Sequence, residues 1–319
     1  MRRPARTRHR KARARGALPL LALAAALAAG GAAGGCSREP RAATTPAYVA
    51  EVDAWHAQRL ERLRAPTGWL TLVGLHELDP GRLNTVGSDS ACAVRLAAPA
   101  PARVGDLAFA GGNWAFAAAP GVAVTTADSA AAPVTTIAMR TDRDGPPTTL
   151  DCGSLQFFVI DRDGSFFLRV KDRASAVLRG FTGIDRYPVD ARWRVTARLE
   201  PGPGTVKVPN VLGQESEEPS PGVLVFRLGG RECRLTPTGA PGEDLFVVFG
   251  DATNGHGTYH GGRFLSAPAP AADGSIVLDF NEAYNPPCVF TPYATCPLPG
   301  KANTLPVPVE AGEKLWGAH

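Results

Sequence analysis

From Gly68 onward the chain is made of short apolar runs separated by turn residues, and helical spacing of apolar residues is absent. Runs at 155–160 and 166–170 flank the pair Asp163-Gly164, and an Asp-Gly pair between apolar runs is a strong β-hairpin signal. Residues 193–199 alternate between apolar and polar side chains, as in a strand with one buried face. These patterns predict an all-β fold, a sandwich followed by a second β-sheet or barrel.

One amphipathic helix is expected before these strands, at residues 47–64. Apolar residues and His56 recur there at helical spacing, while charged residues such as Arg59 occupy the other positions. We expect an N-terminal β unit at 65–140 and a C-terminal β unit at 141–319. The boundary is placed in a stretch dominated by Ala, Thr, Asp and Pro.

Residues 1–36 have the layout of a secretory signal. A basic segment ends at Arg15, an uncharged Ala- and Leu-rich stretch follows at 17–35, and small residues precede Cys36. This order predicts a lipoprotein signal with Cys36 as the lipidated residue, a tether at 37–46, and a protein held on the membrane of the cell envelope by its lipid anchor. A plain cleaved signal and an uncleaved anchor remain alternatives.

The net charge of +4 comes from this leader. Residues 1–36 hold eight Lys and Arg and no acid, so 26 basic and 30 acidic residues remain in the other part of the chain. That part carries no basic excess of the kind that binds phosphate backbones. No nucleic-acid partner is therefore predicted.

Two polar, glycine- and proline-rich segments near the C-terminus hold the candidate ligand-binding residues. Rigid loops often carry binding groups, and an arginine among glycines can grip a carboxylate or phosphate. The alternatives are a buried pair between Arg263 and Asp251 or Asp279, and side chains that only satisfy the loop backbone. The candidates are Tyr259, Arg263, Asp279, Asn281, Tyr284 and Asn285.

Five cysteines remain besides Cys36, and Cys288 and Cys296 are the closest pair in sequence. We predict a disulfide between them, with two buried thiols as the alternative. His256 and His260 lie near Asp251, but the glycine between them argues against a helix that would present both on one face. No metal site and no cofactor are predicted, and the CxxC spacing of zinc sites is absent.

Three blocks of the sequence resemble a bacterial and archaeal family catalogued as domain of unknown function 1684, over about residues 47–314. The blocks lie at 55–88, 181–195 and 249–314, and the last includes Asp279-Phe280-Asn281 and the Pro-Cys loop. The resemblance implies this layout and no known activity. Residues 81–88 are also similar to the opening of forkhead-associated domains, which implies a related sandwich.

Three functions follow from these observations. The first is an exported envelope protein that binds a small or polymeric ligand between loops 255–263 and 279–296. The second is a metal-independent hydrolase with Asp279 as general base and Arg263 stabilising charge. The third is a structural envelope protein without a pocket. Whether the chain is an enzyme stays open, because no Gly-x-Ser-x-Gly, HExxH or Walker motif occurs.

Overall fold

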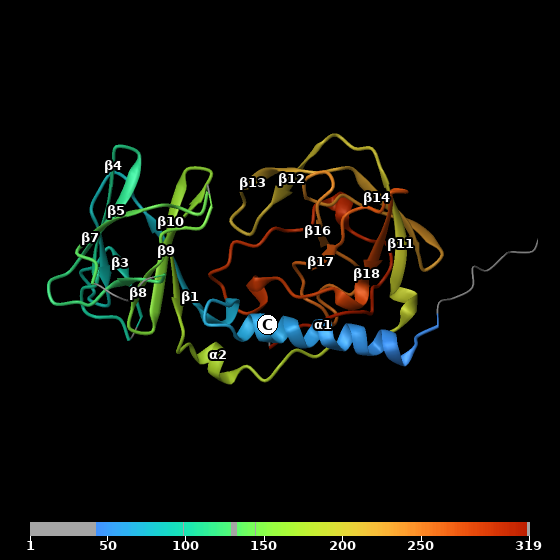
Figure 1. The fold of residues 1–319 in the computed structure, drawn as a ribbon, viewed down its shortest axis with the longest axis horizontal. Helices are drawn as coiled ribbons and strands as arrows, with labels where there is room; N and C mark the ends of the chain where they lie inside the picture. Colours follow the sequence, from blue (N-terminus) through green and yellow to red (C-terminus); the bar gives the residue numbers. More distant parts are fainter. Residues whose placement is uncertain (1–42, 98, 129–132, 144, 318–319) are drawn as a thin grey trace, which may run out of the picture. The chain divides into compact units, whose positions relative to one another are not determined.

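The computed structural model describes residues 43–97, 99–128, 133–143 and 145–317, and most of these belong to β-sheets or their connections (Figure 1). The predicted all-β fold with one N-terminal helix is therefore confirmed. The predicted signal segment, Cys36 and most of the tether lie outside the described residues. Within the described ranges, no helix is both long enough and apolar enough to span a membrane.

Two five-stranded sheets pack face to face as a β-sandwich. In spatial order, one sheet contains β1 (Leu72–Leu78), β10 (Ser165–Asp172), β9 (Leu155–Arg162), β8 (Leu150–Cys152) and β6 (Thr125–Thr126). The other contains β3 (Val94–Arg95), β2 (Asn84–Gly87), β4 (Gly105–Ala110), β5 (Asn113–Ala118) and β7 (Thr136–Met139). Their inward side chains share one core, where the ring centroids of Phe116 and Phe157 lie 5.4 Å apart.

The hairpin predicted from Asp163-Gly164 joins β9 and β10. Both turn residues have positive φ, 53° for Asp163 and 85° for Gly164. Two consecutive residues with positive φ are characteristic of the type I′ turn, whose twist matches that of the flanking strands.

The predicted boundary between residues 140 and 141 is wrong, because it cuts through this sandwich. Strand β1 precedes the boundary and pairs antiparallel with β10, which follows it, from Leu72↔Lys171 to Leu78↔Phe166. The Ala- and Thr-rich stretch is thus a connection inside the sandwich. Composition identifies such a stretch as a connection but does not reveal which strands pair across it.

The second β unit contains one larger sheet and two hairpins. The sheet has the antiparallel order β15 (Arg231–Leu235), β14 (Val223–Leu228), β11 (Arg194–Glu200) and β18 (Ser275–Asp279). The hairpins are β12 (Thr205–Pro209) with β13 (Glu215–Pro219), and β16 (Leu245–Phe249) with β17 (Arg263–Ala267). Trp193 and Ala197 are buried in the shared core, as the alternation predicts. Among the described residues no sheet closes into a barrel.

Helix α1 (Pro46–Arg64) begins with a side-chain cap. The Thr45 hydroxyl accepts a hydrogen bond from the Tyr48 amide at 3.2 Å, and Pro46 occupies the first turn, where its missing N–H costs nothing. The helix buries Tyr48, Val52 and Leu63, but it also buries Arg59, which the periodicity assigns to the solvent side.

Short helical segments complete the fold. They are α2 (Ala176–Gly180), η1 (Trp69–Thr71), η2 (Ala191–Trp193), η3 (Phe280–Glu282), η4 (Pro287–Val289) and η5 (Lys301–Asn303).

Candidate functional site

Arg263, the predicted anion-binding residue, is fully enclosed. Its Nη2 donates to Asp251 Oδ2 and to the Val309 carbonyl oxygen, both at 2.8 Å, and its Nη1 donates to the Ala311 carbonyl oxygen. Both charged side chains have no exposed surface. This is the buried-pair alternative of the sequence analysis, and it leaves Arg263 closed to a ligand from solvent.

Asp279 and Asn281 are held by helix α1 rather than by the arginine loop. Asp279 Oδ2 accepts a hydrogen bond from the Tyr48 hydroxyl at 2.7 Å, and Oδ1 caps η3 by accepting from the Asn281 amide at 3.0 Å. Asn281 Nδ2 donates to the Tyr48 hydroxyl at 2.8 Å and to the Asp190 carbonyl oxygen at 3.0 Å. These side chains therefore satisfy one another and the nearby backbone.

Tyr284 and Asn285 join a second buried polar cluster on α1. Glu313 Oε2 accepts from the Asn285 amide at 2.7 Å, Arg59 Nη2 donates to the Asn285 carbonyl oxygen at 3.0 Å, and the Arg59 guanidinium lies 4.7 Å from the centre of the Tyr284 ring. Arg59 Nε lies 3.5 Å from Glu313 Oε1, and His56 Nε2 lies 3.9 Å from the same oxygen. Burial raises the pKa of Glu313, and Arg59 opposes that rise.

The two predicted loops are joined by backbone rather than separated by a cleft. The amide of Phe264 donates to the Tyr284 carbonyl oxygen and the amide of Tyr284 donates to the Phe264 carbonyl oxygen, each at 2.9 Å. Tyr259 is buried in an apolar cluster with Val289 and Phe290. The six predicted residues thus belong to four different environments, and five of them are buried while Tyr284 is partly buried.

Cys288 and Cys296 are neighbours, as predicted, but both are free thiols in the structure. The Cys288 amide donates to Cys296 Sγ at 3.1 Å, and the Cys288 thiol donates to the Ala294 carbonyl oxygen at 3.5 Å. The predicted disulfide is therefore not formed here, although the loop has brought its two partners together. In the described part of the chain, no three His, Cys, Asp or Glu side chains form a cluster that could hold a metal ion.

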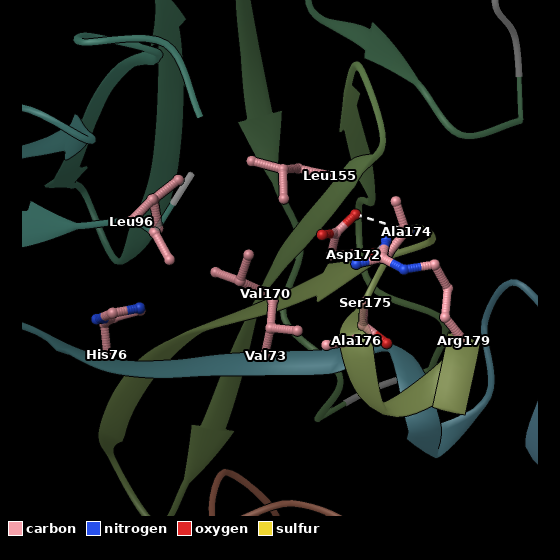
Figure 2. A pocket seen from close by; sticks show the side chains of 11 residues that line it. Val73, His76, Leu96, Leu155, Val170, Asp172, Ala174, Ser175, Ala176 and Arg179 are labelled. Atoms are coloured by element: carbon pink, nitrogen blue, oxygen red, sulfur yellow. Dashed lines mark hydrogen bonds between the residues drawn. The ribbon is translucent and has the colours of Figure 1, made fainter. Parts of the chain in front are cut away.

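A cavity of about 260 Å³ opens elsewhere, at the end of the sandwich where β1, β9 and β10 meet α2 (Figure 2). Apolar side chains make up much of its wall: Val73, Leu96, Leu155 and Val170. In Figure 2, Val73 and Val170 lie between His76 and Asp172. A second hollow, lined among others by Pro99, Val122 and Cys152, has no charged side chain in its wall, so the first is the stronger candidate.

His76 is the cavity residue with the most unusual environment. Burial lowers the pKa of its imidazole, which favours the uncharged form. A Cβ atom added at Gly74 would lie 2.8 Å from His76 Nε2 and 3.3 Å from Val170 Cβ, so the glycine leaves room for the ring to lie over its own strand. Among the described residues, the imidazole has no hydrogen-bond or ion-pair partner.

Asp172 supplies a carboxylate at the end of β10. It is only 8% exposed, and its Oδ1 accepts a hydrogen bond from the Ala174 amide at 2.8 Å. No described residue donates to Oδ2. Ser175, which also lines the cavity, is occupied, since its hydroxyl donates to the Leu70 carbonyl oxygen at 2.6 Å and caps α2. The cavity thus combines apolar walls with two polar groups, His76 and Asp172, that have unused hydrogen-bonding capacity. The exposed side chain of Arg179 also lines it.

Neither His76 nor Asp172 was predicted as a site residue, for a physical reason. His76 reads as a lone histidine in an apolar run, and Asp172 reads as a strand-ending turn residue. The Gly-x-His spacing of Gly74 and His76 is a local signal that the ring folds over the glycine. The cavity itself depends on the pairing of β1 with β10, which no local pattern reveals.

Residues 179–314 match a family model described as Protein of unknown function (DUF1684). The solution NMR structure of an uncharacterised protein from Haloarcula marismortui is 30% identical; the match covers 43% of this chain and 78% of that one, with a TM-score of 0.36. No curated protein matches this chain. The similarity to forkhead-associated domains stays a prediction.

Proposed function

This chain belongs to the DUF1684 family of proteins of unknown function, and we propose that it is an exported, lipid-anchored envelope protein that binds a small ligand in the cavity between His76 and Asp172. One observation carries the binding proposal. An apolar cavity contains the His76 imidazole and the buried Asp172 carboxylate, and neither the imidazole nor Asp172 Oδ2 has a hydrogen-bond partner among the described residues. Apolar pockets with a few converging polar groups are typical small-molecule sites.

The apolar walls and the Asp172 carboxylate favour one class of ligand. Apolar walls favour an apolar body, with a gain of about 25 cal/mol for each Å² of apolar surface removed from water. The free Asp172 oxygen accepts hydrogen bonds and attracts positive charge. A cavity of about 260 Å³ suits a compact molecule. The ligand is therefore a small apolar molecule with a hydrogen-bond donor, such as a primary amine.

This proposal moves the binding site away from loops 255–263 and 279–296. The mutual hydrogen bonding of Tyr48, Asp279 and Asn281 and the enclosure of Arg263 favour a structural role for those loops. The hydrolase hypothesis loses support, because Asp279 accepts hydrogen bonds from α1 and η3 and Arg263 already has an ion-pair partner. A structural envelope protein remains the second candidate, favoured by the closed packing of these loops.

The binding proposal is tested by thermal shift with three related probes: benzylamine, toluene and benzoate. Benzylamine should raise the melting temperature in a concentration-dependent way and toluene should raise it less. Benzoate should raise the melting temperature less than benzylamine, because the buried Asp172 carboxylate opposes its charge, whereas Arg179, which also lines the cavity, is exposed and screened by solvent. Asp172→Asn keeps the acceptor for the Ala174 amide but should abolish the preference for benzylamine over toluene.

Two control variants locate the effect. Glu77→Gln removes an exposed carboxylate next to His76 on β1 and should leave all three responses unchanged. Ala176→Trp places a bulky ring at the exposed mouth of the cavity and should suppress every response. The proposal is wrong if no probe stabilises the parent protein, or if Ala176→Trp responds as the parent does.

A further inference from the structure

The loop after η3 places Cys288 and Cys296 next to each other, with Cys296 more deeply buried than Cys288. Pro286 and Pro287 begin η4, and the Cys288 amide donates to Cys296 Sγ at 3.1 Å. From this arrangement we propose that Cys288 and Cys296 form a redox-active dithiol that exchanges with disulfides, with Cys288 as the attacking thiol and Cys296 as the resolving thiol. This site is independent of the cavity at His76.

The exposure of the two sulfur-bearing residues assigns their roles. Cys296 is buried, with 4% of its surface exposed, whereas Cys288 is only partly buried. A disulfide from solvent can therefore approach Cys288 first. Cys296 is shielded from solvent and lies beside Cys288, which is the position required of a resolving thiol.

A buried arginine lies beside the pair and has unused hydrogen-bonding capacity. Arg169 is 7% exposed; its Nη2 donates to Thr295 Oγ1, the residue before Cys296, at 3.3 Å, and no described residue accepts from its Nε. The charge of Arg169 acts to lower the pKa of Cys296, against a larger rise from Cys288 and burial. A cation beside a buried thiol favours the thiolate that the resolving step needs.

The protonation of the two thiols agrees with these roles. A hydrogen bond from Cys296 lowers the pKa of the Cys288 thiol. The same contact, together with burial, raises the pKa of the Cys296 thiol. The first proton is therefore lost at Cys288. The thiolate is the nucleophilic form of cysteine, so Cys288 attacks before Cys296.

The exchange balances in two steps. The Cys288 thiolate attacks one sulfur of a disulfide such as glutathione disulfide, forms a mixed disulfide and releases one glutathione thiolate, which takes a proton from water. Cys296 then loses its proton to solvent, attacks Cys288 Sγ and releases the second glutathione thiolate. One disulfide is reduced to two thiols, and the Cys288–Cys296 dithiol is oxidised to a disulfide.

Two alternatives without redox exchange predict different behaviour. An inert pair of packed thiols would react with neither oxidant nor alkylating agent in the folded protein. A purely structural disulfide would form once and resist reduction by glutathione, because stable structural disulfides have low reduction potentials.

The test treats the full-length chain with glutathione disulfide and maps the products by peptide mass. The parent should lose the two thiols of Cys288 and Cys296 together and regain them with reduced glutathione. Cys296→Ser should accumulate a glutathione adduct on Cys288, whereas Cys288→Ser should accumulate none on Cys296. Circular dichroism establishes that both variants are folded, and Cys296→Ala repeats the trapping without a hydroxyl.

Alkylation rates give a second, independent measurement. A lowered pKa increases the fraction of Cys288 that is thiolate at neutral pH, so Cys288 should react with iodoacetamide several-fold faster than Cys92, the other partly exposed thiol among the described residues. Three outcomes would each overturn the proposal. Glutathione forms no adduct on Cys288 in either Cys296 variant, Cys288 is alkylated no faster than Cys92, or reduced glutathione leaves the disulfide of the parent intact.

Discussion

Arg263 shows how a charged residue in a glycine-rich loop can serve the fold alone. Its guanidinium is enclosed by Asp251 and by two carbonyl oxygens, and it lies 5.3 Å from the centre of the Phe249 ring. Asp251 is occupied on its other oxygen as well, which accepts from the amides of Thr253 and Val309. Removing either partner would leave the other charge buried and unpaired.

Arg263→Ala should therefore destabilise the protein strongly. Breaking a buried ion pair by removing one partner costs about 3–5 kcal/mol, a large share of the roughly 5–15 kcal/mol that stabilises a domain. The measurement is the melting curve, with Arg234→Ala as the control, because Arg234 pairs with Glu200 on the surface. If Arg263→Ala melts within a few degrees of the parent, the pair does not stabilise the fold as argued.

At the scale of elements, helix α1 stabilises the C-terminal loops through polar contacts as well as apolar ones. Helical spacing predicted the helix and its apolar stripe, but it placed Arg59 in solvent because charged residues normally face water. Glu313 and the Asn285 carbonyl oxygen bind Arg59 from the far end of the chain. Such long-range partners allow a charged residue to be buried. The local spacing of residues contains no information about these partners.

Tyr48→Phe tests the contact between α1 and η3. The substitution removes the hydroxyl that donates to Asp279 and accepts from Asn281, and it leaves both buried side chains short of a partner. An unsatisfied buried polar group costs about 1–3 kcal/mol, so urea unfolding should show a loss of that size. Tyr293→Phe, at an exposed tyrosine, should unfold as the parent does. Equal urea midpoints for the two variants would show that the Tyr48 hydroxyl does not stabilise the fold.

Glu282 at the end of η3 makes stability depend on pH. Burial raises its pKa from 4.5 to about 7, with smaller contributions from the carboxylates of Asp279 and Glu51. The folded protein therefore keeps a proton that the unfolded chain loses between those values, and this contribution to stability is lost as the pH rises through that window.

Glu282→Gln should remove this dependence. Compared with the parent, the variant should be relatively more stable at pH 7.5 than at pH 5, as measured by urea unfolding at both values. His56 and His76, whose pKa values are lowered by burial, are present in both proteins and cancel in the comparison. A parent-to-variant difference that is the same at both pH values would exclude Glu282 as the titrating group.

At the scale of the whole molecule, local sequence signals predicted the helix and several strands, whereas long-range pairing determines how the strands assemble into sheets. Three elements were predictable because each depends on a pattern among neighbouring residues: the Asp163-Gly164 turn, the strand that begins near Trp193 and the helix before Gly68. The pairing of β1 with β10 joins distant segments, so the predicted boundary fell inside the sandwich. The cavity at His76 depends on the same pairing, and for that reason the predicted site was placed in the more conspicuous polar loops.

The anchoring of the whole molecule is tested at Cys36. The order of basic, apolar and small residues before Cys36 predicts lipidation there. Each buried CH₂ of an acyl chain contributes about 0.8 kcal/mol, and stable attachment needs more than one chain or a second signal. Cys36→Ala should therefore lose metabolic labelling with palmitate and leave the membrane fraction, whereas Cys92→Ala should keep both. Label that persists in Cys36→Ala, or a parent protein that is never labelled, would show that this cysteine is not the anchor.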